Sequence, residues 1–465
     1  MTPWLKAGAK GFPLPRRLTS ACRATLTLQG LERSYHLQEV AMVFPANHML
    51  GWRRNGVNHV SMNNRNFDRT LGPIRNTSYP TYTNVLLDWY RTKNVKSVRF
   101  MFTWEAVQSS LRGSIPSAHP GYQDYWEDLT DVLTRLLDKD IYVILCAWQG
   151  NTVIQDTDIV YDDNVFTADD FADFWGKFAT AINAATGDDQ RVAFDLINEP
   201  HVSSGREGEK GISKADWFIC AQAAIDAIRA AGGTNTIFVP GMNFSHGYLF
   251  VRNDSEGIEG SSDEWGNLTD AEGNIAVTVH CYRGLYSEST TVLREECADL
   301  VVWARAHGVK ANVGEIALDA GPNGTDTYCT GTTFASAQAK WADWSAFCGD
   351  NDDVIVGWNW WANSAGNTDL SHWWSANDHC HPNGFNWGLT LNDGNTQTVY
   401  MDLIEASLPV PKGRRPHRPT RKTGGERHRP RQPRTKIPSK PPRPSPNPKA
   451  KRKGQNRGRP KGPSG

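Results

Sequence analysis

The sequence contains no uninterrupted run of about 18 apolar residues, which argues against a membrane-spanning helix. Residues 1–31 carry five Lys or Arg and no acid, yet they also lack the apolar stretch of roughly 7–15 residues that a secretory signal requires. This composition fits either a transit-like leader or an incorrectly assigned start. We therefore separate residues 1–41 from the rest of the chain as a leader of uncertain nature.

Cysteine is sparse, with eight in 465 residues, and no CxxC motif or paired Cys/His spacing is present. This absence argues against a metal site. Cys146 and Cys281 lie inside apolar runs, where we expect them to be buried as small hydrophobic residues. The candidates for one or two disulfides in an exported protein fall around helix ends and in loops: Cys297, Cys329, Cys348 and Cys380. The sequence leaves their pairing open.

Large apolar residues are nearly missing from residues 411–465, which hold 13 of the 26 prolines and 20 Lys or Arg against one acid. The zero net charge thus hides an acidic body near −19 and a basic tail near +19. Such a segment cannot bury enough surface to offset its chain entropy, so we expect a disordered, basic, Pro-rich tail. A basic arm for anionic surfaces or nucleic acid and a misread gene end are the alternatives. Because the tail has no interleaved aromatic residues, we expect no nucleic-acid partner.

Between these ends, residues 42–410 show the pattern of one α/β domain, in which short apolar runs alternate with amphipathic segments. In the segment around Tyr122–Asp138, apolar residues recur at three- and four-residue spacing, which puts them on one helix face. The eight apolar runs are Gly56–Val60, Ser97–Phe102, Ile141–Ala147, Val192–Ile197, Thr236–Pro240, Ile275–Val279, Ala311–Val313 and Val354–Trp358. Eight strands, most followed by a crossover helix, predict one parallel (β/α)8 TIM barrel rather than two domains.

Two carboxylates fall at the carboxyl ends of two of these strands. The fourth run continues into Asn198, Glu199 and Pro200, and the seventh is followed by Glu315. In a (β/α)8 barrel the chemistry takes place at the carboxyl ends of the strands, so we expect the two glutamates to lie close together. Acid/base cleavage of a glycosidic bond needs such a pair, one group to protonate the leaving oxygen and one to attack or stabilise the sugar carbon.

Aromatic and hydrogen-bonding residues interrupt or follow the other strands. They are Asn58 in the first, Arg99 in the second, Trp148 after the third, His280 and Tyr282 after the sixth, and Trp358, Trp360 and Trp361 at the eighth. Indole faces stack on the C–H faces of pyranose rings while amides bond the hydroxyls, so this set is typical of a sugar-binding site. Several of these residues have structural alternatives: Arg99 as the partner of a buried acid, His280 as an interior histidine, and Trp358, Trp360 and Trp361 as core.

The region from Gly56 to about Trp361 resembles the retaining β-glycanases of glycoside hydrolase family 5, a family of cellulase-type (β/α)8 barrels. The matching motifs are Arg99 in Ser-Val-Arg-Phe, Asn198-Glu199-Pro200, His280-Cys281-Tyr282, Glu315 in Val-Gly-Glu and Trp358 in Gly-Trp-Asn-Trp-Trp. The resemblance covers roughly three hundred residues and leaves both termini outside.

This resemblance implies a role for each matching residue. Glu199 corresponds to the general acid/base and Glu315 to the nucleophile, so before attack the pKa of Glu199 should be raised and that of Glu315 depressed. Asn198 would hydrogen-bond the 2-hydroxyl of the cleaved sugar, and His280 would line the same subsite. Tyr282 would hydrogen-bond Glu315, and Arg99 would lie beneath it and favour its ionised form. Trp358 would be the stacking platform, with Trp360 just beyond it. Many family members have His where this chain has Trp148, which leaves the close sugar contacts open.

The resemblance further implies an endo-β-1,4-glucanase that hydrolyses cellulose or a related β-glucan with net retention. A β-mannanase or glucomannanase on the same scaffold and a catalytically silent glycan-binding barrel are the alternatives. No metal and no organic cofactor is implied. We expect a monomeric, secreted protein because the substrate is an extracellular polysaccharide, although residues 1–31 show no clear signal peptide.

Overall fold

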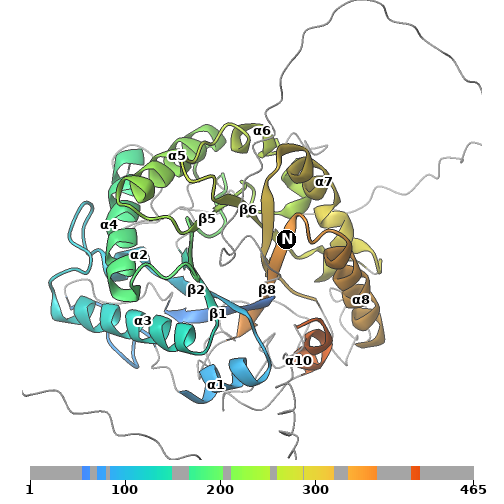
Figure 1. Cartoon of the computed structure of the whole chain (residues 1–465), viewed down its shortest axis with the longest axis horizontal. Helices are drawn as coiled ribbons and strands as arrows, with labels where there is room; N and C mark the ends of the chain where they lie inside the picture. Colours follow the sequence, from blue (N-terminus) through green and yellow to red (C-terminus); the bar gives the residue numbers. More distant parts are fainter. Residues whose placement is uncertain are drawn as a thin grey trace, which may run out of the picture. The chain divides into compact units, whose positions relative to one another are not determined.

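Eight short apolar runs form eight parallel strands, which neighbour one another in sequence order and close into a barrel (Figure 1). The computed structural model describes residues 55–62, 71–79, 84–148, 167–202, 211–251, 259–285, 287, 289–318, 334–363 and 399–408. The closed barrel confirms the fold class predicted from the sequence. The leader (1–41) and the basic tail (411–465) lie outside the described residues, so both remain predictions.

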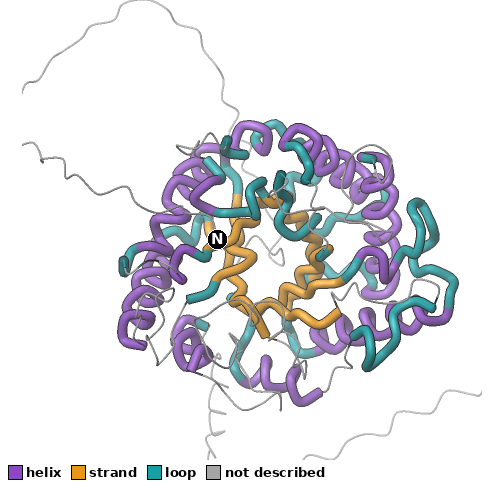
Figure 2. The backbone as a smooth tube through the Cα atoms, turned by 180° about the vertical axis from the view of Figure 1, so that it is seen from behind, coloured by secondary structure: helices purple, strands orange, loops and turns teal. Residues whose placement is uncertain are grey.

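The strands occupy the apolar runs that the sequence indicates. Their bounds are β1 Gly56–Met62, β2 Ser97–Phe102, β3 Tyr142–Ala147, β4 Val192–Asp195, β5 Thr236–Pro240, β6 Ile275–Cys281, β7 Lys310–Ile316 and β8 Ile355–Asn363. Strands that are covered on both faces read as nearly continuous apolar runs rather than as an alternation. Figure 2 shows this arrangement, with the strands as an inner ring and the helices around it.

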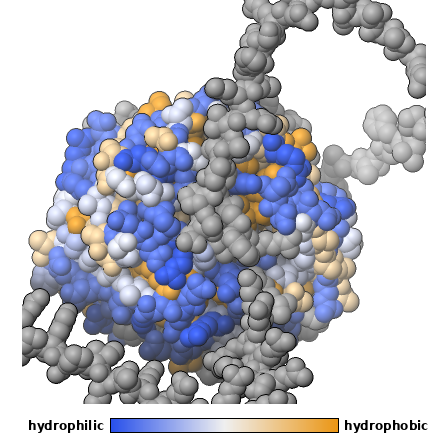
Figure 3. Space-filling model, viewed as in Figure 1, coloured by the Kyte–Doolittle hydropathy of each residue, from blue (hydrophilic) through white to orange (hydrophobic). Residues whose placement is uncertain are grey.

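Helices cover the outside of the barrel. Their bounds are α1 Asn84–Thr92, α2 Trp104–Val107, α3 Pro120–Asp138, α4 Ala168–Thr186, α5 Lys214–Ala230, α6 Ser262–Trp265, α7 Val292–His307, α8 Phe334–Asp350 and α10 Val399–Ile404, with 3-10 turns η2 Gly247–Leu249, η3 Arg283–Leu285 and η4 Glu405–Ser407. The face predicted for α3 is confirmed, because it is buried at Leu129, Val132, Leu133, Leu136 and Leu137. Hydrophilic residues cover most of the described surface in Figure 3. None of the helices in the described part of the chain has both the length and the apolar character of a membrane span.

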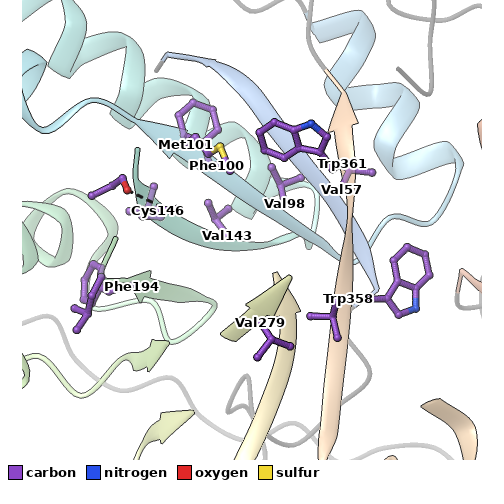
Figure 4. Close-up of a cluster of buried hydrophobic side chains, with 14 of the residues drawn as sticks. Val57, Val98, Phe100, Met101, Val143, Cys146, Phe194, Val279, Trp358 and Trp361 are labelled. Atoms are coloured by element: carbon purple, nitrogen blue, oxygen red, sulfur yellow. Dashed lines mark hydrogen bonds between the residues drawn. The ribbon is translucent and has the colours of Figure 1, made fainter. Parts of the chain in front are cut away.

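Buried side chains form two separate clusters. The larger one joins the strands to the helices, as where Phe102 of β2 stacks on Phe178 of α4 with ring centroids 4.5 Å apart, and Figure 4 shows part of it. The smaller one consists of residues from β3, β4, β5, β6 and β8: Ile144, Ala193, Phe238, Ala276 and Val356. Because register partners on parallel strands face the same side and Ile144 pairs with the inward-facing Arg99, this small cluster fills the barrel interior. We call it the apolar floor.

Five cysteines lie in the described residues, and all are buried free thiols: Cys146, Cys220, Cys281, Cys297 and Cys348. The burial predicted for Cys146 and Cys281 is confirmed. Cys297 and Cys348, named above as candidates for disulfides, carry free thiols here. The other two candidates lie outside the described residues.

We expect Thr167→Ala to lower the free energy of unfolding by about 1 kcal/mol, because Thr167 and Asp170 form a capping box at the start of α4. Thr167 Oγ1 accepts the Asp170 N–H at 3.3 Å, and Asp170 Oδ2 accepts the Thr167 N–H at 2.7 Å. Urea unfolding followed by circular dichroism measures the change. Thr134→Ala on the exposed face of α3 removes the same atoms without a cap, and an equal loss there would contradict the assignment.

Candidate active site

The two glutamates predicted as a catalytic pair lie together at the carboxyl ends of β4 and β7. Glu199 follows β4 in a left-handed backbone conformation with φ of 53°, and Glu315 is the last residue but one of β7. His280 lies between them, with its Nδ1 2.7 Å from Glu199 Oε1 and 3.4 Å from Glu315 Oε2. One oxygen of each carboxylate and one His280 nitrogen all lie within 4.8 Å of one another. The fold therefore brings these three residues into one cluster.

Arg99 lies beneath this cluster and is fully buried on β2. A guanidinium has five N–H groups, and five acceptors surround this one. They are, with their distances from the donor nitrogen, Asp195 Oδ2 (2.7 Å), Glu315 Oε1 (2.8 Å), Asn198 Oδ1 (3.0 Å), Cys146 Sγ (3.0 Å) and Asn58 Oδ1 (3.1 Å). One buried cation on β2 thus connects residues in or directly after β1, β3, β4 and β7.

Close packing favours glycine at residue 314. A Cβ there would lie 2.5 Å from Thr278 Oγ1, which is too close, and 3.4 Å from Arg99 Nε, which is an ordinary contact. The carbonyl of Gly314 also accepts a hydrogen bond from Asn58 Nδ2 at 2.8 Å. The residue before Glu315 is therefore constrained by close packing against Thr278 of β6.

Both oxygens of Glu315 are held by donors. Tyr282 Oη donates to Oε2 at 2.5 Å, and Arg99 Nη1 donates to Oε1. Burial raises the pKa of Glu315 and the nearby Glu199 adds to the rise, whereas His280, Arg99 and the Tyr282 hydrogen bond lower it. The depressed pKa expected for Glu315 is therefore not found, because the loss of hydration outweighs the favourable contacts.

Glu199 has a more open environment than Glu315, since its side chain is 26% exposed against 3% for Glu315. Burial nonetheless raises the pKa of Glu199 to about 7, although Arg99 and His201 oppose the rise. Burial also lowers the pKa of His280 to about 3, so its imidazole is neutral at higher pH. A neutral Nδ1 can accept from a protonated Glu199 or, as the other tautomer, donate to an ionised one. Glu199 can therefore change protonation state while this contact persists.

The tryptophans of β8 alternate between the two faces of the strand. Trp358 and Trp360 are 1% and 0% exposed, and both pack edge-on against Trp341 of α8. Trp361 leaves the strand on the side opposite to Trp358 (Figure 4) and stacks on Trp148 with centroids 5.7 Å apart and 21° between the planes. This placement corrects the platform expected at Trp358 and removes Trp360 from the site, because both rings are enclosed between strand and helix. Trp361, which is 8% exposed, and the half-buried Trp148 lie on the other side of β8.

Asp195 was not named from the sequence, and Asn58 and Trp361 were named only as members of the sugar-binding set, without individual roles. Asp195 is an acid within the apolar run of β4, and a buried charge requires a partner, so the signal was present. The sequence does not show which residues Asn58 contacts, because Arg99 and Gly314 are distant from it in sequence. Trp361 could be found only by knowing that Asn359 faces inward, where its Nδ2 donates to Ser97 Oγ at 3.0 Å.

Glu199, His280 and Glu315 also form the one group, among the described residues, whose donor atoms are close enough to hold a metal ion. The Arg99 guanidinium, 2.8 Å from Glu315, places a positive charge beside this group and opposes a second cation. That no metal is needed remains a prediction.

Known proteins resemble this chain in both sequence and fold. The family model for cellulase (glycosyl hydrolase family 5) matches residues 60–364. Endoglucanase 1 of Robillarda sp. (strain Y-20) is 29% identical over 340 residues, 67% of this chain and 76% of its own length. Endoglucanase 1 of Saitozyma flava is 28% identical over 203 residues, 41% of this chain and 52% of its own length. The solved structure of XacCel5A in complex with cellopentaose shares the fold, with a TM-score of 0.60, 23% identity, and coverage of 77% of this chain and 100% of that one. Because the family model spans well over half of the sequence, the chain belongs to glycosyl hydrolase family 5, the cellulase family.

Proposed function

We propose that the protein is an endo-acting, retaining glycoside hydrolase that cleaves β-1,4-glucosidic linkages in cellulose or a related β-glucan. The spacing of the two carboxylates carries this proposal, since an oxygen of Glu199 and one of Glu315 lie within 4.8 Å of each other. Retaining enzymes hold these groups about 5–5.5 Å apart, whereas inverting enzymes leave about 6.5–9.5 Å for a water molecule. The endoglucanase names of the relatives support a β-glucan as the substrate.

The reaction takes two displacements at the anomeric carbon. In the first, Glu315 attacks this carbon while Glu199 gives its proton to the glycosidic oxygen, so the leaving sugar departs and a glycosyl ester of Glu315 forms. In the second, the ionised Glu199 takes a proton from water, and the water oxygen displaces Glu315. The raised pKa of Glu199, about 7, keeps it protonated for the first step in weakly acidic solution.

Arg99 and Tyr282 prepare Glu315 for attack, because they hold its two oxygens and stabilise its ionised form against the loss of hydration. When Glu315 becomes an ester, its negative charge disappears, the pKa of Glu199 can fall, and Glu199 can act as the base. Arg99 also occupies Oδ1 of Asn198 at 3.0 Å, which points the amide NH2 group away from the guanidinium. We assign that NH2 group to the 2-hydroxyl of the cleaved sugar, a contact that strengthens at the transition state.

Trp361 and Trp148 provide the apolar surface on which we place the cleaved sugar ring. His280 lines the same subsite through its contact with Glu199. Because a polysaccharide is too large to enter a cell, we place the enzyme outside the cell. We also propose that it acts as a monomer.

Reducing-sugar release from soluble cellulose, mixed-linkage glucan, xylan and mannan tests the reaction and its substrate. We expect release from the glucans by wild type and a loss of about 10⁴-fold or more in Glu315→Ala. Proton NMR of the first-formed product should show the β anomer. Glu127→Ala, on the exposed surface of α3, should behave as wild type. Release mainly from mannan would change the assigned substrate, and a first-formed α anomer would contradict retention.

The pH dependence of kcat/KM should follow the protonation of Glu199. The free enzyme needs protonated Glu199, and its pKa of about 7 means that the competent fraction falls as pH rises through that value. We therefore expect kcat/KM to fall about tenfold per pH unit on the alkaline side. Circular dichroism at each pH shows whether the protein stays folded. A rate that is constant to about pH 9 in a folded protein would rule out Glu199 as the acid.

Trp361→Ala and Trp358→Ala separate the sugar platform from the core. We expect Trp361→Ala to lower kcat/KM on soluble glucan about tenfold, through loss of a stacking contact. Trp358→Ala should instead lower the free energy of unfolding by about 3–5 kcal/mol, because it empties a site between β8 and α8. Assays at low temperature compare the two variants, and circular dichroism at that temperature shows whether each is folded. Equal loss of kcat/KM in both would contradict the assignment of Trp361.

A further inference from the structure

A short turn follows the strand end that carries Tyr282. Strand β6 ends at Cys281 and η3 begins at Arg283, so Tyr282 is the one residue between them. Its hydroxyl donates to Glu315 Oε2 at 2.5 Å, while its carbonyl accepts the Leu285 N–H at 2.9 Å and closes the turn. The position of the hydroxyl on Glu315 therefore depends on how the backbone of this turn is held.

Glu296 of α7 holds this backbone from the helix side. Its Oε1 accepts the N–H of Arg283, the residue after Tyr282, at 3.1 Å. Glu296 is only 1% exposed, and its other oxygen, Oε2, has no hydrogen-bond partner among the residues that the structure describes. Burying a carboxyl group is costly unless hydrogen bonds replace its hydration. The contact that Glu296 makes in return is with the turn that carries Tyr282.

Burial raises the pKa of Glu296 to about 8, although hydrogen bonds from the backbones of Arg283 and Tyr282 and the charge of Arg283 oppose the rise. In the weakly acidic solution in which Glu199 is protonated, the carboxyl group of Glu296 is therefore uncharged. A neutral carboxyl group still has an oxygen that accepts a hydrogen bond. The contact with the turn thus needs the shape of Glu296 and an acceptor oxygen, but it does not need a charge.

Two further contacts hold the same segment against helices. On one side of Tyr282, Cys281 Sγ lies 3.3 Å from Sγ of Cys297 on α7. On the other side, the fully buried Lys340 of α8 donates from Nζ to the carbonyl of Gly284 at 3.2 Å. The chain is thus attached to helices both before and after Tyr282.

We propose that Glu296 is a positioning residue, which keeps the Tyr282 hydroxyl on Glu315 by holding the backbone that follows Tyr282. This inference rests on the proposed function. Without the Glu296 oxygen the N–H of Arg283 loses its acceptor, and the turn shifts to find another one. Such a shift moves the adjacent Tyr282, so Glu315 Oε2 loses its donor. Because Glu296 is buried behind the turn, it acts through Tyr282 and not on the sugar.

A double-mutant cycle with cellotetraose as the substrate tests this. We expect Glu296→Met, which keeps the length of the side chain but offers no oxygen, to lower kcat about tenfold and to change KM by less than about twofold. Tyr282→Phe removes the hydroxyl itself and should lower kcat about 10- to 100-fold. In the Tyr282→Phe background, Glu296→Met should lower kcat by less than about a further twofold, because the hydroxyl that Glu296 positions is already absent.

Two control variants separate positioning from a general loss of structure. Glu296→Gln keeps an acceptor oxygen in a side chain of the same shape, so its kcat should stay within about twofold of wild type. Asp189, at the amino end of the barrel before β4, is the matched control because its carboxyl group also accepts a backbone N–H, that of Arg191 at 2.9 Å. Asp189→Ala should leave kcat within about twofold in both Tyr282 backgrounds.

Thermal unfolding followed by circular dichroism shows whether each variant folds, and Glu296→Asp, which shortens the side chain, tests the same prediction if Glu296→Met does not fold. Equal fold-losses of kcat from Glu296→Met in the two Tyr282 backgrounds, or no loss beside an intact Tyr282, would overturn the inference. A loss in Glu296→Gln as large as that in Glu296→Met would overturn it too. A wild type that hydrolyses neither cellotetraose nor soluble cellulose would instead overturn the proposed function, and this inference with it.

Discussion

The buried guanidinium of Arg99 is the interaction on which the rest of the site depends. Removing a cation from water costs several kcal/mol unless charges and hydrogen bonds replace its hydration. Here Asp195 and Glu315 supply the charge, each within 2.8 Å, and neutral acceptors take the remaining N–H groups. Glu315 is thus at once a candidate nucleophile and one of two acids that balance Arg99. The Gly314 backbone, next to Glu315, is also constrained, because a Cβ there would lie 2.5 Å from Thr278 Oγ1.

The apolar floor explains why burial dominates the pKa of both glutamates. Ile144 pairs in register with Arg99, and Ala193 pairs with Ile144, so apolar side chains continue the layer in which the guanidinium lies. Small interior residues such as Ala193 leave room for a long side chain, while Ile144 and Phe238 fill the rest. Hydration can therefore reach the carboxyl groups only from the carboxyl end of the barrel. This is the end at which a substrate would approach, and a bound sugar would remove still more water.

The eight strands, their order and the positions of Glu199, Glu315 and Arg99 could be predicted from the sequence, because each depends on residue type at the end of an apolar run. The orientation of side chains on β8 could not. Alternation says that Trp358 and Trp361 face opposite sides, but not which of them faces inward. The register of β8 shifts against both neighbours, β1 and β7, so counting from either strand does not settle it. The direction of the pKa shift of Glu315 could not be predicted from the sequence either, because it depends on the balance between burial and four neighbouring groups.

Burial raises the pKa of both carboxyls, so it does not by itself distinguish their roles. Their partners do. Glu315 is held by Arg99 and Tyr282 at both oxygens, which fixes its orientation but gives it little access to water. Glu199 instead contacts His280, a neutral imidazole that accepts or donates, and its side chain remains partly exposed. A nucleophile needs fixed geometry, whereas a group that gives up and regains a proton in each cycle needs access to solvent. The donors around Glu315 and the partial exposure of Glu199 therefore support the proposed roles of nucleophile and acid/base by an argument that does not use the family resemblance.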